Sequence, residues 1–327
     1  MKGIDEMEIF NKLRNIVKKE DDKLKFNILV EEWLENKKIS IKESTYCNYV
    51  YVINKYIIPT FENIEIKELQ NYNFNDFVME LMEELSTKTV RDILCILKAI
   101  LCYANEEYDC NIKISKIKSP KLVQGNVTIL SNREKGRLEN YCIRVNTLKS
   151  MGILICLNTG IRIGELCALK WNNIDLDKKI LYVNNTLQRV YDKKQKKTKI
   201  IIDVPKTAKS IRQIPISNKL YQILKTIKNK YNDDNFFLTG SSEKFIEPRN
   251  YQKYFKNVLR KCRIKSYKFH TLRYNFATDL IERGATLIQV KELMGHSNIR
   301  STMAYVHVAN VKMDLESPLD AFMKEEK

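Results

Sequence analysis

The apolar residues in the first third of the chain recur at helical spacing. From Phe26 they fall at positions i, i+3, i+4, i+7 and i+8, which places them on one face of an amphipathic helix. A second helix is predicted from a Ser44 cap to the residues before Pro59, because proline disfavours helical geometry in the residue that precedes it. The same period recurs over residues 74–85 and 87–101. Four such helices joined by short loops predict a helical bundle.

A lysine-rich stretch follows the bundle and divides the chain. Residues 112–127 contain four lysines, one proline and one glycine, and no apolar period spans them. We interpret them as a basic linker between a helical domain at residues 23–111 and a second domain at residues 128–310. Residues 1–22 form a charged N-terminal extension that is too short to be a domain of its own.

The second domain combines two kinds of periodicity. Short strand patterns at residues 180–190, 199–204 and 211–216 lie between segments with helical spacing. The expected fold class is therefore α+β, mainly helical with a small antiparallel sheet.

Charge narrows the choice of partner. The net charge is +17, from 57 Lys+Arg against 40 Asp+Glu. This excess favours a polyanionic partner, most often nucleic acid, with a solvated basic surface as the alternative. The longest strongly apolar run, residues 151–157, is too short to cross a bilayer, and no secretory signal opens the chain. Together with eight cysteines that form no C-x-x-C pair, these features predict a cytoplasmic protein without a membrane partner.

No cofactor or metal is expected. The phosphate-binding patterns G-x-x-x-x-G-K-[ST] and G-x-G-x-x-G do not occur in the sequence. A zinc site is also not expected, because two of the three histidines belong to motifs that need no metal.

Three motifs follow one another in the second domain. They are TGIRIGEL at residues 159–166, HTLRYNFAT at residues 270–278 and LMGHSN at residues 293–298, with Tyr305 nine residues after His296. In this order they resemble the arginine box, the H-x-x-R box and the L-G-H box of the tyrosine recombinase (phage integrase) family. Residues 85–94 of the bundle resemble the core-binding domain of the same family.

The residue types in these motifs suit phosphodiester chemistry. Negative charge grows on the non-bridging oxygens when a phosphodiester is attacked, and guanidinium groups can each donate two charge-assisted hydrogen bonds to them. Arg162 and Arg273 are the candidates for this clamp. His270, three residues before Arg273, points the same way on a helix, and His296 offers another donor.

Tyr305 is the candidate nucleophile. We expect its pKa, ordinarily about 10, to be lowered by the surrounding positive charge. Glu165, three residues after Arg162, orients the site rather than attacking. Structural alternatives remain for each residue: Arg162 and Glu165 could form an ordinary surface ion pair, and only its spacing from His296 distinguishes Tyr305 among 17 tyrosines.

The leaving 5′-oxygen needs a proton, and the resemblance suggests its source. Residues 205–210 resemble the family's β-hairpin whose lysine acts as the acid, and this implies Lys206, with Lys209 as the alternative. Met294 and Tyr274 depart from residues that are common in the family, and both changes are compatible with catalysis.

The resemblance implies a site-specific DNA recombinase that integrates, excises or inverts DNA through a 3′-phosphotyrosine. The implied partners are double-stranded DNA sites and, on DNA, a homo-tetramer of chains that are monomers when free, together with an accessory directionality factor. Such an enzyme would work in the bacterial cytoplasm in association with the nucleoid. The alternatives are a type IB topoisomerase-like enzyme and a DNA-binding regulator without catalysis.

Residues 311–327 form a C-terminal tail with one apolar stripe. Leu315, Leu319, Phe322 and Met323 fall at i, i+4, i+7 and i+8 of a short helix that cannot be stable alone. The stripe must therefore be buried, either on its own domain or, as the resemblance implies, on a neighbouring protomer.

Overall fold

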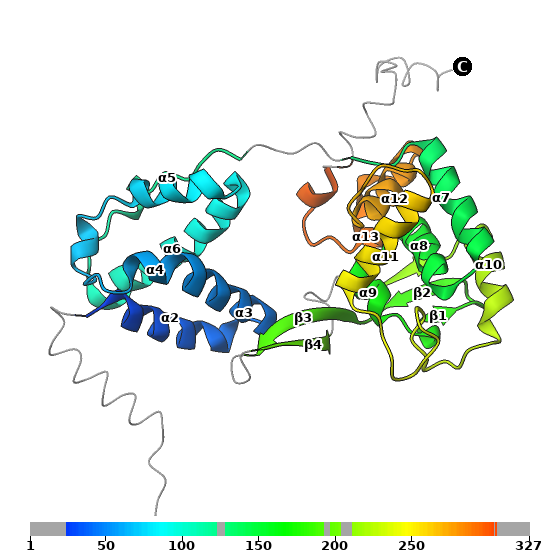
Figure 1. Cartoon of the computed structure of the whole chain (residues 1–327), viewed down its shortest axis with the longest axis horizontal. Helices are drawn as coiled ribbons and strands as arrows, with labels where there is room; N and C mark the ends of the chain where they lie inside the picture. The colour runs from blue at the N-terminus through cyan, green and yellow to red at the C-terminus, as the bar shows by residue number, and fades with distance from the viewer. Residues whose placement is uncertain (1–23, 123–127, 193–196, 204–210, 304, 306–327) are drawn as a thin grey trace, which may run out of the picture. The chain divides into compact units, whose positions relative to one another are not determined.

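The computed structural model describes residues 24–122, 128–192, 197–203, 211–303 and 305. The chain divides into two compact units (Figure 1). The first comprises Met1–Gly125 together with Arg189–Lys199, and the second comprises Asn126–Gln188 and Ile200–Lys327.

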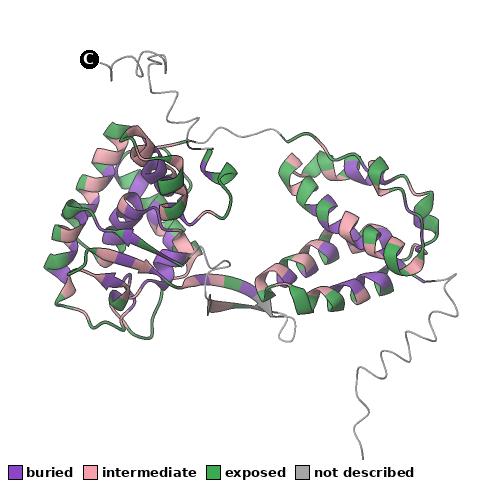
Figure 2. Ribbon diagram, turned by 180° about the vertical axis from the view of Figure 1, so that it is seen from behind, coloured by how far each residue is buried: buried purple, intermediate pink, exposed green. Residues whose placement is uncertain are grey.

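The first unit is the helical bundle that the sequence predicts. Its helices are α2 (Phe26–Ser40), α3 (Glu43–Val52), α4 (Ile58–Phe61), α5 (Phe74–Glu84) and α6 (Thr87–Tyr108). The hydroxyl of Ser86 caps α6 by accepting from the backbone N–H of Thr89 at 3.3 Å. Helix α6 contributes eight buried residues and packs against α2 and α5. Figure 2 shows the buried residues on the inner faces of these helices.

The second helix does not stop before Pro59 as the sequence predicts. A π-helical turn, Ile53–Ile57, follows α3, and α4 then begins with the proline in its first turn. Proline has no N–H to donate and crowds the preceding turn of a helix, and a wider turn in front of it lets the chain continue. The continuation is stabilised because Ile57 and Phe61 are fully buried in the core of the bundle.

Part of the stretch expected to be a linker packs onto the first unit. Ile112 and Ile117 are buried in its core. The side chain of Asn105 on α6 pairs with both backbone polar groups of Ile112, at 2.8 and 2.9 Å. Lys98 of α6 donates to the carbonyl of Ile117 at 2.8 Å, and Arg91 to that of Pro120 at 2.8 Å. Side chains of α6 thus satisfy a backbone that has no period of its own, which a search for periodicity cannot detect.

The second unit is built around a helix most of whose residues are buried. This helix, α8 (Leu148–Thr159), packs against α7 (Asn132–Val145), α10 (Asn218–Lys228) and α12 (Thr271–Glu282). The other helices are α9 (Ile163–Ala168), α11 (Pro248–Lys261) and α13 (Leu287–Met294). The sequence pattern does not predict α7, a highly charged helix that begins with a capping box of Ser131 and Glu134.

The strands form two small antiparallel arrangements. Strands β1 (Ile174–Asp175), β2 (Ile180–Val183) and β5 (Arg212–Pro215) make a sheet in the order β1-β2-β5, with Leu181 opposite Ile214. Strands β3 (Thr186–Asp192) and β4 (Lys197–Asp203) form a separate two-stranded hairpin. The single strand expected at residues 180–190 is therefore interrupted between β2 and β3. The predicted fold class, mainly helical with small antiparallel sheets, is confirmed.

A buried asparagine fixes the first described residues of the second unit. The backbone N–H of Leu130 donates to Oδ1 of Asn275 at 3.0 Å, and Nδ2 of Asn275 donates to the carbonyl of Leu130 at 3.0 Å. Both residues are buried, and Asn275 lies on α12. The side chain satisfies the two backbone groups as a neighbouring strand would.

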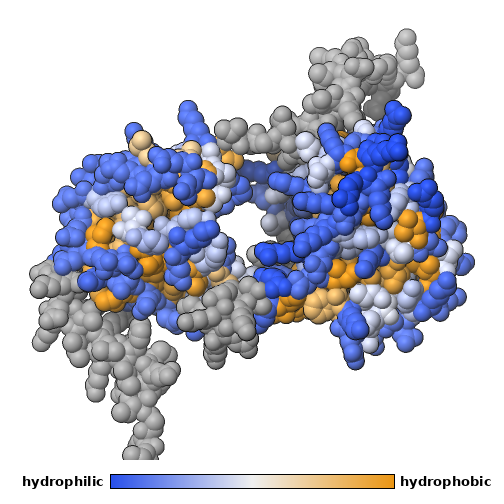
Figure 3. Space-filling view, viewed as in Figure 1, coloured by the Kyte–Doolittle hydropathy of each residue, from blue (hydrophilic) through white to orange (hydrophobic). Residues whose placement is uncertain are grey.

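The viewed surface of both units is mostly hydrophilic, with smaller exposed apolar patches (Figure 3). Among the described residues no helix has both the length and the apolar character needed to span a membrane.

Candidate active site

A tight turn between α8 and α9 presents the first arginine of the site. Gly160 ends α8 with φ +64°, in the left-handed region that favours glycine. A Cβ on this residue would also collide with the ring of Phe276. The close approach leaves the carbonyl of Gly160 as an acceptor for Nη1 of Arg273, at 2.6 Å. One turn thus links the arginine box to α12.

Arg162 stands directly before α9 and is held by Glu165. The backbone N–H of Arg162 donates to Oε2 of Glu165 at 2.8 Å, and its Nη1 donates to Oε1 at 2.8 Å. Its Nη2 approaches the carbonyl of Gly295 at 3.4 Å. The side chain of Arg162 remains 37% exposed, against 3% for Glu165, so the guanidinium faces the surface while the carboxylate that orients it is buried.

A second arginine completes the surroundings of Glu165. Arg212 of β5 donates from Nη1 and Nη2 to the two oxygens of Glu165, at 3.1 and 2.9 Å, and both side chains are buried. Burial opposes ionisation of Glu165, but the hydrogen bonds and charge of Arg212, followed by those of Arg162, outweigh it and lower the pKa to about 2. Glu165 is therefore a carboxylate at any pH where the protein would work.

Arg273 is buried at the centre of the site. Its Nη1 donates to Gly160, and its Nη2 donates to the carbonyl of Met294 and meets Nε2 of His296 at 3.0 Å. Burial, followed by the charge of Arg162, lowers its pKa to about 10, so the guanidinium stays protonated at neutral pH. Its Nε is buried without a hydrogen-bond partner in the described structure. A buried N–H of this kind is costly unless a ligand oxygen satisfies it.

His270 directly precedes α12, and its side chain lines the same cavity as that of Arg273. Part of the residue is exposed, but neighbouring atoms bury the imidazole ring and remove water from it. Arg273 and Arg162 add positive charge nearby. These effects lower its pKa to about 4, so His270 is neutral at neutral pH. The ring stands perpendicular to that of Tyr274, with centroids 4.8 Å apart.

His296 is held in one tautomer by its two neighbours. Arginine can only donate, so Nε2 of His296 accepts from Arg273 and Nδ1 carries the proton toward the hydroxyl of Thr302, at 2.9 Å. Burial and the charges of Arg273 and Arg162 lower the pKa of His296 to about 3. In this arrangement Nε2 does not donate, in contrast to the sequence-based expectation. Nε2 can donate to a phosphate once Arg273 releases it and the ring carries a proton on Nε2, either as the other neutral tautomer or as the imidazolium.

Tyr305 lies in a small apolar cluster between α12 and α13. It is 3% exposed, and its ring stacks on that of His296 with centroids 5.8 Å apart and lies 5.4 Å from that of Tyr274. Burial raises the pKa of Tyr305, and the nearby charge of Arg273 opposes this effect without reversing it. The expectation that positive charge lowers this pKa is therefore wrong, because a sequence gives no measure of desolvation.

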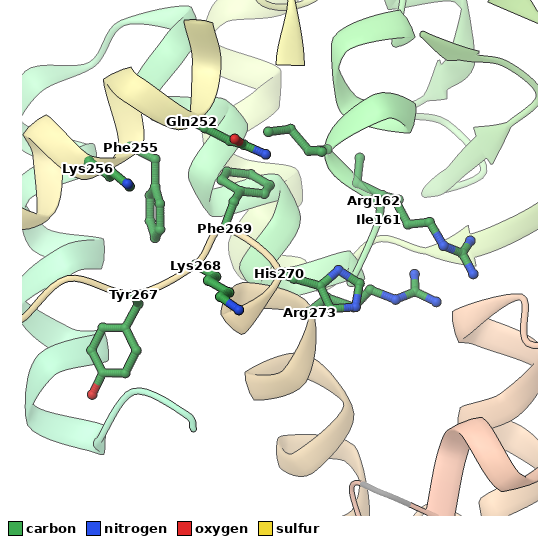
Figure 4. A pocket seen from close by; sticks show the side chains of 11 residues that line it. Ile161, Arg162, Gln252, Phe255, Lys256, Tyr267, Lys268, Phe269, His270 and Arg273 are labelled. Atoms are coloured by element: carbon green, nitrogen blue, oxygen red, sulfur yellow. The ribbon is translucent and has the colours of Figure 1, made fainter. Parts of the chain in front are cut away.

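The first two boxes open onto one basic cavity of about 380 Å³. Figure 4 shows the guanidinium groups of Arg162 and Arg273 extending in the same direction, with the ring of His270 beside Arg273. Lys256 from α11 and Lys268 also line the cavity. An anionic ligand fits this lining, because the two arginines and two lysines carry positive charge and His270 can form hydrogen bonds.

The structure places six of the predicted residues, and the seventh lies outside its described part. Arg162, Glu165, His270, Arg273, His296 and Tyr305 come together from four segments of the second unit. Lys206 and its alternative Lys209 lie outside the described residues. Within the described ranges, no three histidine, cysteine or acidic side chains lie close enough to hold a metal ion.

Two residues that hold the predicted side chains in place are missed by reasoning from sequence. Arg212 occupies an inward position of β5, where alternate residues are buried, and Thr302 holds the imidazole of His296. An arginine in phase with Ile214 and Ile216 in a predicted strand was a usable signal for a buried ion pair. Thr302 carries no comparable signal.

Comparison with known proteins identifies the family. The pattern of the phage integrase family matches residues 128–311, and that of the phage integrase N-terminal SAM-like domain matches residues 25–82. The tyrosine recombinase XerC-like protein of Caldanaerobacter subterraneus subsp. tengcongensis is 29% identical, over 92% of this chain and 84% of its own length.

Two solved structures have the same fold. The Tn1549 transposon integrase in complex with transposon right end DNA has a TM-score of 0.71 at 18% identity, covering 92% of this chain and 98% of that chain. A lambda integrase tetramer bound to a Holliday junction has a TM-score of 0.66 at 15% identity, covering 92% of this chain and 83% of that chain.

The fold and these likenesses define a DNA strand-exchange enzyme with tyrosine chemistry. The chain belongs to the phage integrase family, and it is a tyrosine-type site-specific DNA recombinase. The predicted family and function are thereby confirmed, and no comparison favours a topoisomerase-like enzyme or a non-catalytic regulator.

The low pKa of His296 makes stability depend on pH. The unfolded ring has a pKa of 6.5 and the folded ring one of about 3, so unfolding takes up a proton between these values and stability is lost as pH falls through this window. We expect His296→Gln, which cannot titrate, to reduce proton uptake on unfolding by about one. Denaturant unfolding at a series of pH values measures this uptake from the slope of the unfolding free energy. An unchanged slope in the variant would contradict the low pKa.

Proposed function

We propose that Tyr305 attacks the scissile phosphodiester while Arg162 and Arg273 bind its non-bridging oxygens. The observation that carries the proposal is the convergence of two guanidinium groups and His270 on one cavity, with Tyr305 stacked on His296 in the same unit. Each guanidinium has donors to offer: Arg162 is partly exposed, and Nε of Arg273 has no partner in the described structure. Fixed donors of this kind stabilise the charge that develops on the phosphate.

Tyr305 must change position or surroundings before it reacts. Its ring is 3% exposed and its pKa is raised, so the hydroxyl is neither accessible to a DNA phosphate nor ionised in this state. DNA binding supplies a phosphate that can displace Arg273 from its acceptors. The tyrosine proton passes to a neutral imidazole, of which His270 is the candidate that lines the cavity.

The reaction then balances without an external energy source. The Tyr305 oxygen forms a bond to phosphorus as the bond to the 5′-oxygen breaks, and that oxygen takes a proton from Lys206. The product is a 3′-phosphotyrosine that keeps the energy of the broken phosphodiester. Attack by another 5′-hydroxyl reverses the step and joins the strands.

The proposed domains divide DNA binding between them. Residues 23–111 form the core-binding domain and residues 128–310 the catalytic domain, with residues 112–127 connecting them and residues 1–22 as an extension. In the catalytic domain, α11 supports DNA contact, because its exposed positions carry basic and amide side chains and no acidic residue. Basic residues contact the phosphate backbone and amides can contact base edges.

The first prediction of this proposal concerns the nucleophile. Tyr305→Phe removes only the hydroxyl, so we expect the variant to fold and to bind a recombination site while forming no covalent complex. A nicked recombination site traps the covalent product on a denaturing gel. Tyr274→Phe is the matched control, since Tyr274 lies beside Tyr305, and it should still form the complex. Covalent product from Tyr305→Phe would assign the attack to another residue.

The second prediction separates the acid from the rest of the site. Lys206→Ala should block cleavage of an ordinary strand but spare a strand with a 5′-phosphorothiolate, because a thiolate leaves without a proton. Lys209→Ala is the control and should cleave both substrates. If the sulfur substrate rescues the Lys209 variant instead, Lys209 is the acid.

The third prediction concerns assembly. We propose that four chains, monomers when free, pair two DNA sites, and that the tail at residues 311–327 contacts a neighbouring protomer. A chain truncated after Asn310 should bind a single site in a gel shift and pair two sites poorly. Normal pairing would refute the tail contact, and loss of folding by circular dichroism would show that the tail packs on its own domain.

The proposal extends to the setting of the reaction. An accessory factor that sets the direction of recombination is expected to act with the protein, and a chromosomal substrate places the enzyme at the nucleoid in the bacterial cytoplasm. Recombination between two sites is measured with the purified protein, with and without host extract, to test whether the factor is needed.

A further inference from the structure

Arg212 is a buried arginine at a position where the fold itself would accept an apolar residue. The side chain is 5% exposed, on a strand where Arg212 and Ile214 face inward and Gln213 and Pro215 face outward. An apolar residue would fill this position at lower cost, because an arginine must have its donors satisfied when it leaves water. It finds them in two directions: Glu165 accepts from both Nη atoms, and the carbonyl of Leu293 accepts from Nε at 2.7 Å.

Both acceptors support residues of the catalytic clamp. Glu165 accepts from the backbone and side chain of Arg162. Leu293 lies near the end of α13, one residue before Met294, whose carbonyl accepts from Arg273, and three residues before His296. One rigid guanidinium therefore fixes the support of Arg162 and the chain segment that contacts Arg273.

We infer that Arg212 is a positioning residue of this recombinase, which aligns Arg162 through Glu165 and the Met294–His296 segment through Leu293. The inference rests on the proposed function of the site and adds to it the part that holds the clamp in place. Arg212 does not line the cavity that Arg162, His270 and Arg273 share, so it acts through these neighbours.

The alignment of Arg162 depends on the charge of Glu165. Protonated Glu165 would lose much of its attraction for Arg162. The charged and titratable groups that face this carboxylate are Arg162 directly before α9, Arg212 from β5, Arg273 from α12, His270 directly before α12, and Cys156 from α8.

Among these groups, Arg212 contributes most to keeping Glu165 ionised. His270 is neutral at neutral pH, and burial raises the pKa of the Cys156 thiol, which is neutral as well. Without the charge of Arg212, burial would raise the pKa of Glu165, and the carboxylate would take up a proton at a higher pH.

The test compares cleavage at several pH values in variants of the full chain. Arg212→Met removes the charge at similar length, Arg212→Lys keeps the charge but lacks the fork, and Arg212→Met with Glu165→Gln removes the titrating group. Arg144→Met, at an exposed arginine of α7, is the matched control. Covalent complex formation on a nicked site is measured from about pH 5.5 to about pH 8.5, with single-site binding as a second measurement.

We expect single-site binding of the Arg212 variants to stay close to that of the unmodified chain. Relative to the unmodified chain, Arg212→Met should cleave about tenfold more slowly at the alkaline end, because loss of the fork misaligns a clamp residue. It should be slower still at the acidic end, where Glu165 takes up a proton, so part of the loss is recovered toward alkaline pH. The double variant should be slow at all pH values and lack the recovery. Arg144→Met should follow the unmodified chain.

A uniform loss in Arg212→Met at every pH, or a normal rate, would overturn the inference. If Arg212→Met fails to fold, Arg212→Lys tests the inference instead. It should cleave about tenfold more slowly than the unmodified chain at every pH, without a further fall in rate at acidic pH. A normal rate in that variant would also overturn the inference. Tyr305→Phe is run in parallel. Covalent product from this variant would show that the proposed nucleophile is wrong, and this result does not depend on the rates of the Arg212 variants.

Discussion

The site depends on the pairing of Glu165 with two arginines. A buried carboxylate is unfavourable by itself, and so is a buried guanidinium, but together they exchange four hydrogen bonds that involve Arg162 and Arg212. This pairing allows positive charge to accumulate near Arg273 without driving the segments apart. It leaves the excess charge directed at the cavity, where an anion can neutralise it.

Without DNA the clamp is largely satisfied by the protein itself. Arg273 donates to two main-chain carbonyls and to His296, and Tyr305 is buried against the ring of that histidine. In the proposed mechanism a phosphate replaces these contacts when it is bound. The cost of replacing them then favours strands that many other contacts already hold, which couples cleavage to correct binding.

The sequence predicts which residues form the candidate site better than it predicts how those residues are buried and contacted. The ordered boxes locate Arg162, His270, Arg273, His296 and Tyr305, because spacing along helices and turns is local information. Burial is not local. The direction of the Tyr305 pKa shift, the role of Arg212 and the tautomer of His296 depend on segments far apart in the sequence.

The same limit applies to the fold. Long amphipathic helices such as α6 are predicted from periodicity, whereas the chain after α6 packs through Asn105 and Lys98, whose role no pattern reveals. The helix through Pro59 continues because Ile57 and Phe61 are needed in the core, and a rule for single residues does not weigh that requirement.

The pairing of Asn275 with Leu130 sets a limit on how the second unit can be isolated. A fragment that begins after Leu130 would leave both polar atoms of the Asn275 amide buried without partners, and each would cost about 1 to 3 kcal/mol. The strain would fall on α12, two residues from Arg273. An expression boundary chosen from the helices alone, at the start of α7, would therefore disturb the candidate active site.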